Sequence, residues 1–257
     1  MDLGIKDKVA VVVGTKSIGR AVALELGLEG AKVLAHYNRS AGEAEEVVSE
    51  LKAKGREALA FKADASKESE VNAMFERAVA AFGAVDILVH VAGVWPTSAV
   101  VDMTLEQWEE CMRVNMTSVF LTNRWLVRHL RERNAPGSIL NYTSQAAFLG
   151  STTFHAHYSA AKAAVVAFTI SLAREMAPYG IRVNSIAPGL CYSYMGGDGI
   201  PYEGAKPEAE EYYKTRIPMK RIATAEEIAH AAVFAVSDRN TYMTGATINV
   251  SGGMLMR

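Results

Sequence analysis

The amino-acid sequence predicts an α/β fold: a single doubly wound parallel sheet of about seven strands with helices on both faces. Short, continuously apolar runs recur along the chain, as expected for strands that are buried on both faces of a sheet. Longer helical patterns alternate with these runs, which is typical of strand–helix–strand units. The 257 residues contain no linker, repeat or low-complexity tract, so we expect a single domain over residues 1–257.

The first half of the chain repeats one unit, a buried strand followed by a helix. The first strand is a run of valine and alanine, and a turn with glycine at both ends, Gly14 and Gly19, leads from it into a helix. Gly55 and Gly83 follow later helices as C-terminal caps, because glycine adopts the left-handed conformation without strain. The expected elements are strands 8–13, 31–36, 57–62 and 86–91 and helices 20–29, 41–54 and 67–82.

The second half of the chain has clear helix start signals. Thr104 and Gln107 match a capping box, and so do Thr224 and Glu227. The first box opens a helical region that continues, whether whole or broken, to Arg133. The remaining expected elements are strands 138–142, 181–186 and 246–250 and helices 156–178 and 225–236.

The segment 190–215 interrupts this alternation with a mixture of glycine, proline and tyrosine residues. A long irregular segment inside a compact domain is usually functional. We therefore expect a lid over a ligand site, in which Tyr192 and Met195 are candidate substrate contacts.

Composition and charge exclude several classes of function. The formal net charge is −1, so no basic surface for nucleic acid or an anionic membrane is expected. Cys111 and Cys191 lie far apart, which predicts neither a disulfide framework nor a metal site. The N-terminus lacks the apolar core of a signal peptide, and no run reaches the roughly 18–20 apolar residues of a membrane span. We expect a cytoplasmic location.

Tyr158 and Lys162 are four residues apart in the predicted helix 156–178. That spacing places both side chains on one helix face, about 5–6 Å apart at Cβ. A nearby positive charge favours phenolate and lowers the pKa of a tyrosine, which would suit it to proton transfer. Most tyrosine–lysine pairs of this spacing are structural, so the pair needs support from the rest of the chain.

The turn from Gly14 to Gly19 and the end of the second strand together predict a dinucleotide site. A glycine-rich turn that opens a helix offers backbone N–H groups to a pyrophosphate. The second strand ends in Asn38, Arg39 and Ser40, without the carboxylate that would hold the ribose hydroxyls of NAD. Arg39 suits a ribose phosphate, with a solvated loop arginine as the alternative, and Lys16 could add charge to the same pocket.

With these landmarks in order, the chain resembles the short-chain dehydrogenase/reductase family over essentially its whole length. The resemblance implies a Rossmann-like fold and a nicotinamide cofactor, with adenine near Asp64. The residues that match the family pattern are Asp64 with Ala65, Ala92-Gly93, Asn115, Ser144, Tyr158 with Lys162, Pro188-Gly189 and Ser193. The expected cofactor contacts are Gly14, Lys16, Ser17, Ile18, Gly19, Asn38, Arg39, Ser40, Asp64, Ala65, Ala92, Gly93, Tyr158, Lys162, Pro188, Gly189 and Ser193.

The resemblance also implies a catalytic set. Ser144 would hydrogen-bond the substrate oxygen while Tyr158 donates or removes its proton. Lys162 would lower the pKa of Tyr158 and bind the nicotinamide ribose, and Asn115 would anchor a water that leads to solvent. The hydride is supplied by the cofactor, which the protein orients.

The chain departs from the family pattern most clearly in the turn formed by residues 14–19, which we call the phosphate turn. The usual Gly-xxx-Gly-x-Gly is one residue short here, and its middle glycine is deleted or replaced. The cofactor is still expected to bind across Lys16–Ile18 at the helix N-terminus. His90-Val91 stands where the family usually reads Asn-Asn.

Several further residues are candidate walls of the substrate pocket. Trp95 follows Gly93 and Phe148 follows Ser144, so both lie on loops at the ligand edge. His155 precedes Tyr158 and could touch substrate, although a structural role is the simpler expectation.

The sequence therefore predicts an oxidoreductase that interconverts a carbonyl and a secondary alcohol, with NADP(H) favoured and NAD(H) an alternative. The 3-oxoacyl-carrier-protein reductase and glucose dehydrogenase branches of the family look most similar. One rival is an NAD-dependent dehydrogenase of a cyclic alcohol, steroid or aromatic degradation intermediate. Another is a non-catalytic dinucleotide-binding regulator, since fold alone does not determine function. Family analogy implies a homotetramer and a small-molecule substrate.

Overall fold

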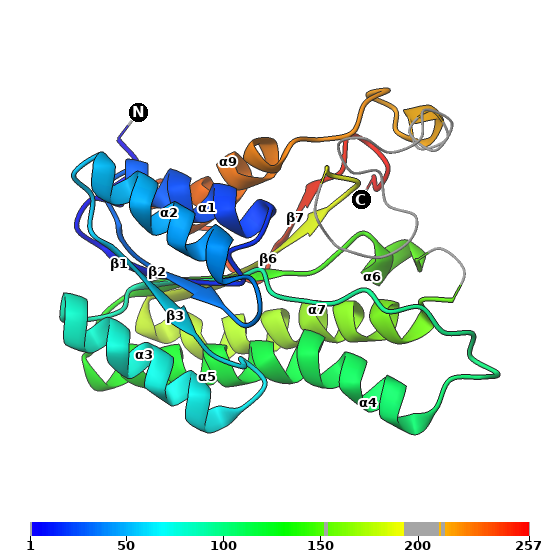
Figure 1. Cartoon of the computed structure of the whole chain (residues 1–257), viewed down its shortest axis with the longest axis horizontal. Coiled ribbons are helices and arrows are strands. Elements are labelled where there is room, and N and C mark those ends of the chain that lie inside the picture. Colours follow the sequence, from blue (N-terminus) through cyan, green and yellow to red (C-terminus); the bar gives the residue numbers. More distant parts are fainter. Residues whose placement is uncertain (1, 152–153, 193–210, 212–213, 257) are drawn as a thin grey trace.

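Seven parallel strands form one sheet in the order β3-β2-β1-β4-β5-β6-β7 (Figure 1). The computed structural model describes residues 2–151, 154–192, 211 and 214–256. The strands are β1 (Val9–Val13), β2 (Lys32–Tyr37), β3 (Ala58–Lys62), β4 (Ile87–His90), β5 (Gly137–Tyr142), β6 (Ile181–Pro188) and β7 (Thr247–Val250). The order reverses between β1 and β4, and ligands of doubly wound sheets bind beyond the carboxyl ends of the strands at such a point.

The helices lie in two layers (Figure 1). Helices α1, α2 and α9 share one apolar core with the sheet, and α3, α5 and α7 share a second core on its other face. The helices are α1 (Ile18–Leu28), α2 (Ala41–Ala53), α3 (Glu68–Phe82), α4 (Leu105–Met112), α5 (Ser118–Glu132), α6 (Ala146–Leu149), α7 (Ala156–Met176) and α9 (Ala225–Val236). The predicted doubly wound arrangement is therefore confirmed.

Strand β1 shows why the sheet buries both faces. Every residue of β1 is buried, with Ala10 and Val12 in the core beneath α1 and the other three residues, all valine, in the core beneath α3. Val13, the last residue of β1, pairs with His36 of β2 on one side and with His90 of β4 on the other. Two buried histidines thus flank the carboxyl end of the central strand.

Both predicted capping boxes are present, before α4 and before α9. The main differences from the sequence prediction lie at the ends of elements. Helix α1 begins at Ile18, two residues earlier than expected, and β6 continues to Pro188. The short helix α6 was not predicted. The helical region after Thr104 is interrupted by a five-residue π-helix, η1 (Arg113–Thr117), and α7 is followed by the 3-10 helix η2 (Ala177–Tyr179).

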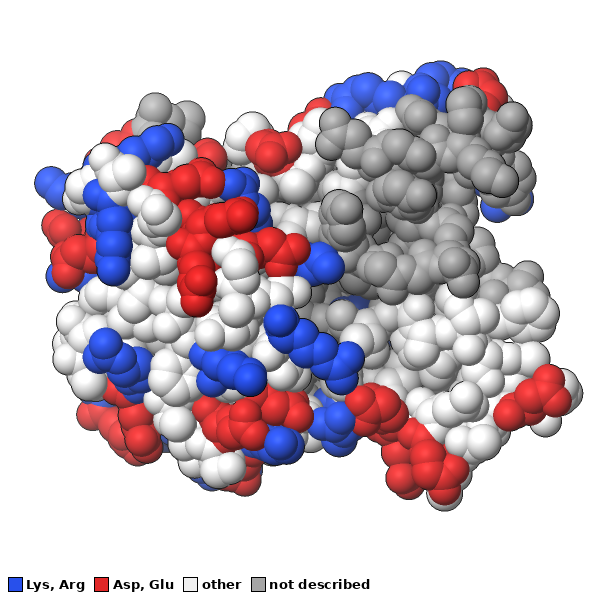
Figure 2. Space-filling view, in the orientation of Figure 1, with Lys and Arg blue, Asp and Glu red and all other residues white. Residues whose placement is uncertain are grey.

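The charged side chains are well mixed on the face shown in Figure 2, where acidic and basic groups alternate over the helices. The surface around the loop before α4 is mostly uncharged, and the apolar side chains of Val100, Val101 and Leu105 are exposed there. Within the described part of the chain, no helix is both long enough and apolar enough to cross a membrane.

Candidate active site

The turn between β1 and α1 is packed tightly against the residues that follow β4. Gly14 has a φ of 92°, and a Cβ on it would lie 2.8 Å from the Cα of Ala92. A Cβ on Gly19 would lie 1.8 Å from the carbonyl oxygen of Gly14. Both positions therefore require glycine. The turn opens into the N-terminus of α1, where free N–H groups favour an anion, so the residues present fit a dinucleotide pyrophosphate.

Ser17 precedes α1 in a backbone conformation that favours glycine, with φ 50° and ψ −110°. It stands directly before Ile18 and Gly19, where the family pattern has its middle glycine. The serine therefore replaces that glycine, and the missing residue lies earlier in the turn. The Ser17 hydroxyl does not cap α1. The Nζ of Lys16 lies 4.0 Å from Oε1 of Glu43 in α2, which places its charge beside the start of that helix.

The residues predicted to hold the adenosine ribose follow β2. Asn38 and Arg39 are exposed, and Ser40 directly precedes α2 without capping it through its side chain. This arrangement leaves the guanidinium of Arg39 accessible at the edge of the predicted site.

Asp64 lies at the end of the neighbouring strand β3, beside the buried Ala65. One carboxylate oxygen accepts hydrogen bonds from the backbone N–H and the hydroxyl of Ser66, at 3.0 and 2.6 Å. Burial would raise the pKa of Asp64, but the Ser66 hydrogen bonds and the charges of Arg113 and Lys67 outweigh it and hold the pKa below its usual value. Asp64 is therefore ionised at neutral pH, and its carboxylate can accept a hydrogen bond.

Asn115 lies in the π-helix η1 and is completely buried. Its amide clamps the backbone of Val94, with Nδ2 donating to the Val94 carbonyl at 3.0 Å and Oδ1 accepting from the Val94 N–H at 3.1 Å. A Cβ on Gly93 would lie 2.7 Å from Asn115 Oδ1 and 3.2 Å from Lys162 Nζ. Glycine at this position thus lets two predicted catalytic side chains approach the end of β4, and π-helical segments are frequent at functional sites.

Tyr158 and Lys162 lie on the buried face of α7, as their spacing predicts. The Lys162 Nζ is 5.8 Å from the centroid of the Tyr158 ring and donates a hydrogen bond to the Tyr142 carbonyl at 2.9 Å. Ser144 hydrogen-bonds with Tyr158, and its hydroxyl oxygen also accepts from the Ala146 N–H at 3.1 Å. The structure therefore brings Ser144, Tyr158 and Lys162 together.

The pKa of Tyr158 is raised, not lowered as the sequence prediction had it. Burial raises this pKa to about 12, and the hydrogen bond with Ser144 offsets only part of the shift. The cause is that a buried phenolate is poorly solvated. Burial also lowers the pKa of Lys162 to about 8. At neutral pH Tyr158 is consequently a protonated phenol beside a largely charged lysine, and this is the form that can donate a proton.

Two of the predicted pocket residues form an aromatic stack. The rings of Trp95 and His155 lie 3.8 Å apart at an interplanar angle of 15°. His155 Nδ1 donates to the Pro96 carbonyl at 2.8 Å, and Trp95 Nε1 donates to the Ser151 hydroxyl at 3.3 Å. Trp95 also packs against the buried cluster of Cys111, Ala146 and Tyr158. The two rings and their hydrogen bonds thus hold the stack in place against the cluster that contains Tyr158.

The other predicted contacts are divided between described and undescribed residues. Phe148 lies on α6, which packs against α7. A Cβ on Gly189 would lie 2.7 Å from the Cα of Ser251, so the end of β6 is packed closely against the C-terminal segment. Tyr192 is joined to the Ala223 carbonyl through its backbone N–H at 3.0 Å. Ser193, Met195 and most of the predicted lid lie outside the described residues.

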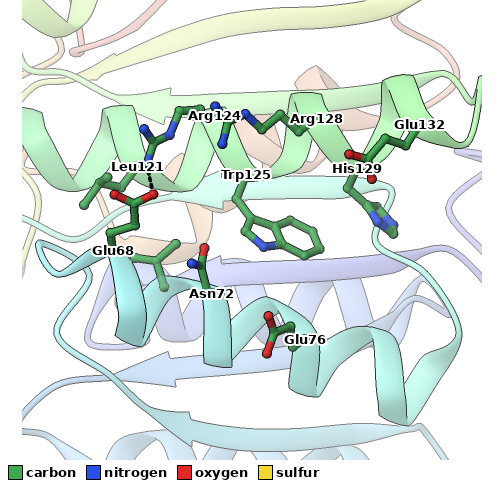
Figure 3. A pocket seen from close by; sticks show the side chains of 10 residues that line it. Glu68, Asn72, Glu76, Leu121, Arg124, Trp125, Arg128, His129 and Glu132 are labelled. Atoms are coloured by element: carbon green, nitrogen blue, oxygen red, sulfur yellow. Dashed lines mark ion pairs between the residues drawn. The ribbon is translucent and has the colours of Figure 1, made fainter.

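A separate hollow of about 260 Å³ lies between α3 and α5 (Figure 3). Its lining residues come from these two helices, and none of them is a predicted site residue. Trp125 projects into it, stacked on Phe75 with ring centroids 4.4 Å apart, and Arg124 pairs with Glu68 across one end at 2.5 Å. The hollow is thus distinct from the group around Tyr158.

Sequence reasoning missed two residues that touch the predicted site. Arg113 at the start of η1 lies 3.5 Å from Asp64 and joins this predicted adenine contact to the segment that carries Asn115. His36 accepts a hydrogen bond from the Gly14 N–H at its Nδ1. His36 could have been noticed in the sequence as a polar residue near the carboxyl end of the otherwise apolar strand β2. No pattern in the sequence identified Arg113.

Comparison with known proteins agrees with this geometry. The family described as enoyl-(acyl carrier protein) reductase matches residues 12–255. The chain is 37% identical to the 3-oxoacyl-[acyl-carrier-protein] reductase FabG of Staphylococcus epidermidis, over 97% of this chain and 100% of that protein. It is 38% identical to 3beta-hydroxysteroid dehydrogenase 1 of Eggerthella lenta, over 98% of this chain and 95% of that protein. A solved dehydrogenase/reductase from Sinorhizobium meliloti 1021 superposes with a TM-score of 0.90 at 31% identity, covering 100% of this chain and 99% of that one.

Proposed function

The chain belongs to the short-chain dehydrogenase/reductase family, whose members are NAD(P)-dependent oxidoreductases of CH–OH and C=O groups, and we propose that it interconverts a ketone and a secondary alcohol with NADP(H) as the favoured cofactor. The observation that carries this proposal is the cluster of Ser144, Tyr158 and Lys162 beyond the carboxyl ends of the central strands. These side chains come from different elements, and a cluster of this chemistry suits proton transfer to or from a substrate oxygen.

In this proposal Ser144 and Tyr158 hold the substrate oxygen, and Tyr158 gives it the proton from its phenol. The pKa of about 12 keeps that proton on the phenol at neutral pH until a substrate oxygen accepts it. Lys162 stabilises the phenolate that remains, because a cation near an anion lowers its free energy. Asn115 holds the backbone of Val94 in place beside this group. The nicotinamide, when bound, supplies or accepts the hydride.

The preference for NADP(H) rests on the residues after β2. No acidic residue lies between Lys32 and Ser40, and Arg39 is exposed there. A guanidinium pairs with a phosphate through charge-assisted hydrogen bonds, whereas a carboxylate would be needed to select the ribose hydroxyls of NAD. Gly14, Ser17 and Gly19 would hold the pyrophosphate at the N-terminus of α1, and Asp64 with Ala65 would meet the adenine.

The proposed substrate class is a ketone or alcohol on a mostly apolar skeleton. The Trp95–His155 stack packs against the cluster that contains Tyr158, and the surface before α4 exposes apolar side chains. The relatives named above are a 3-oxoacyl-[acyl-carrier-protein] reductase and a 3beta-hydroxysteroid dehydrogenase. The alternative substrate is a cyclic or steroid alcohol, because a flat ring system would pack well against the aromatic stack.

The test is a panel of 3-oxoacyl thioesters, ketosteroids and their alcohols with NADPH and NADH, followed by the absorbance of the reduced cofactor. Turnover that is faster with NADPH is the expected result. Cofactor binding without turnover of any compound would favour a dinucleotide-binding regulator instead. Faster turnover with NADH would favour the NAD-dependent alternative.

We also propose a homotetramer, by analogy with the family. Leu105 and Trp108 of α4 and Phe120 of α5 expose apolar surface that a second copy could bury. Light scattering during size-exclusion chromatography measures the mass directly, and a monomer would contradict the analogy.

A further inference from the structure

The phosphate turn is joined to a single residue of β2 by three hydrogen bonds. The backbone N–H of Gly14 donates to Nδ1 of His36 at 3.0 Å. The backbone N–H and the hydroxyl of Thr15 both donate to the His36 carbonyl oxygen, each at 3.0 Å. His36 is 2% exposed, so these bonds are shielded from water. The first two residues of the turn therefore take their position from His36.

The hydrogen bonds also determine which ring nitrogen of His36 carries the proton. A backbone N–H can only donate, so Nδ1 must accept from Gly14 and cannot be protonated. Nε2 must then carry the proton, and it donates to the Ala63 carbonyl at 2.9 Å. Ala63 directly precedes Asp64, the predicted adenine contact. The imidazole is thus a strut between the turn that meets the pyrophosphate and the strand end that meets the adenine.

The hydrogen bonds of His36 matter particularly here because the phosphate turn is one residue shorter than the family pattern. The shorter turn contains Ser17 at a positive φ and offers fewer backbone N–H groups to an anion. Loss of any one bond that holds the turn in shape would therefore change the direction of the remaining N–H groups.

We propose that His36 is a positioning residue for the cofactor. Its Nδ1 holds the backbone N–H of Gly14 at the start of the phosphate turn. Its Nε2 holds the carbonyl of Ala63, next to the predicted adenine contact Asp64. This inference rests on the proposed function, since it assumes a dinucleotide in this site. His36 touches no reacting atom in this role. It acts through Gly14 and Ala63.

Two substitutions separate the two ends of the strut. In His36→Asn the amide oxygen can occupy the place of Nδ1 and accept from Gly14, but the side chain is too short for Ala63. In His36→Gln the amide nitrogen can occupy the place of Nε2 and donate to Ala63, while the acceptor for Gly14 is lost. Both variants replace the ring by an amide, so they are matched in polarity.

We expect His36→Gln to weaken the binding of both NADPH and NADH by about threefold to tenfold, the value of one neutral hydrogen bond. His36→Asn should stay within about twofold of wild type, and kcat at saturating cofactor should be unchanged in both variants. Without cofactor, amide hydrogen exchange at Gly14 should accelerate in His36→Gln and remain slow in His36→Asn. A merely structural role would change stability without this contrast between the variants.

His90→Asn is the matched control, because His90 is equally buried, pairs with the same Val13 on the other side of β1, and hydrogen-bonds Thr122 of α5 instead of the turn. It should leave Gly14 exchange and the dissociation constants unchanged. If the His36 variants fold poorly, Thr15→Val compared with Thr15→Ser removes one bond to the same carbonyl, and only the valine variant should bind cofactor more weakly.

Three results would overturn the inference. The first is that His36→Asn and His36→Gln have equal dissociation constants for NADPH and NADH, although the wild-type protein binds these cofactors. The second is Gly14 exchange that is the same in both variants. The third, wild-type protein that binds neither NADPH nor NADH, would overturn the proposed function and the role of His36 with it.

Discussion

At the scale of single residues, Ser17 is the clearest case of backbone strain in the site. Its φ of 50° with ψ of −110° is a conformation that side chains other than glycine rarely adopt. Ser17→Gly should therefore raise the free energy of unfolding by about 1 kcal/mol, the strain relieved being larger than the entropy cost of glycine. Thermal unfolding measures the change.

Ser17→Ala is the control for this prediction, because alanine lacks the hydroxyl but keeps the Cβ that causes the strain. It should leave the melting temperature close to that of wild type. A glycine variant that melts no higher than the alanine variant would show that the turn does not strain Ser17.

Arg39 decides the choice of cofactor in our account. Its guanidinium is exposed after β2, where no carboxylate competes with it for the ribose. Arg39→Ala should weaken NADPH binding by about tenfold to a hundredfold, as expected for a charge-assisted hydrogen bond, and should leave NADH nearly unchanged. Titration with both cofactors checks this. If NADPH and NADH binding weakened equally, Arg39 would not bind the ribose phosphate.

The site residues that could be predicted from the sequence are those that belong to a recognisable motif. The spacing of Tyr158 and Lys162 placed them on one face of a helix, and the structure agrees. The direction of the Tyr158 pKa shift could not be predicted, because it depends on burial by residues distant in sequence. The role of His36 depends likewise on the register that sets Val13 beside it, and Arg113 reaches Asp64 only in the folded chain.

At the scale of elements, helix α4 depends on its N-terminal cap. The Thr104 hydroxyl accepts from the Gln107 N–H at 3.2 Å, and the Gln107 side chain accepts from the Thr104 N–H at 3.0 Å. Thr104→Ala should cost about 1 kcal/mol of stability, the usual value for an N-cap. Urea denaturation measures the loss. Thr97→Ala, in the exposed loop before α4, should cost much less, and equal losses would contradict the cap assignment.

Most elements were predictable because their signals are local. Apolar runs identified the strands, and the capping boxes identified the starts of α4 and α9. Helix α6 was missed because four residues are too few for a periodic pattern. The π-helix η1 was missed because its extra residue is accommodated by the packing of Asn115 against Val94, which no local pattern reports.

At the scale of the whole molecule, buried histidines should make stability depend on pH. Burial lowers the pKa of His36, although the Ala63 hydrogen bond and the charges of Asp64 and Glu70 oppose the shift. Burial, and after it the charge of Lys162, lowers the pKa of His90 well below its usual value. Both rings are therefore neutral in the folded protein at pH values where the unfolded chain, with a histidine pKa of about 6.5, takes up protons.

The sign of the effect follows from this difference. Stability is fully present above about pH 6.5 and falls as the pH drops below it, by up to about 1.4 kcal/mol per pH unit for each such histidine. Denaturant titrations at pH 7.5 and 5.5 test this, and His90→Asn should reduce the slope. A free energy of unfolding that is equal at the two pH values would contradict the neutral state of both rings.

The most direct test of the whole account is the turnover of Tyr158→Phe on whichever ketone or alcohol wild type accepts. The substitution removes one oxygen from a buried side chain on α7 and leaves the phosphate turn untouched, so cofactor binding should persist. We expect kcat/KM to fall by about 100- to 10,000-fold, the usual contribution of a general acid. A folded, cofactor-binding variant that turns over at the wild-type rate would contradict the assignment of Tyr158 as the proton donor.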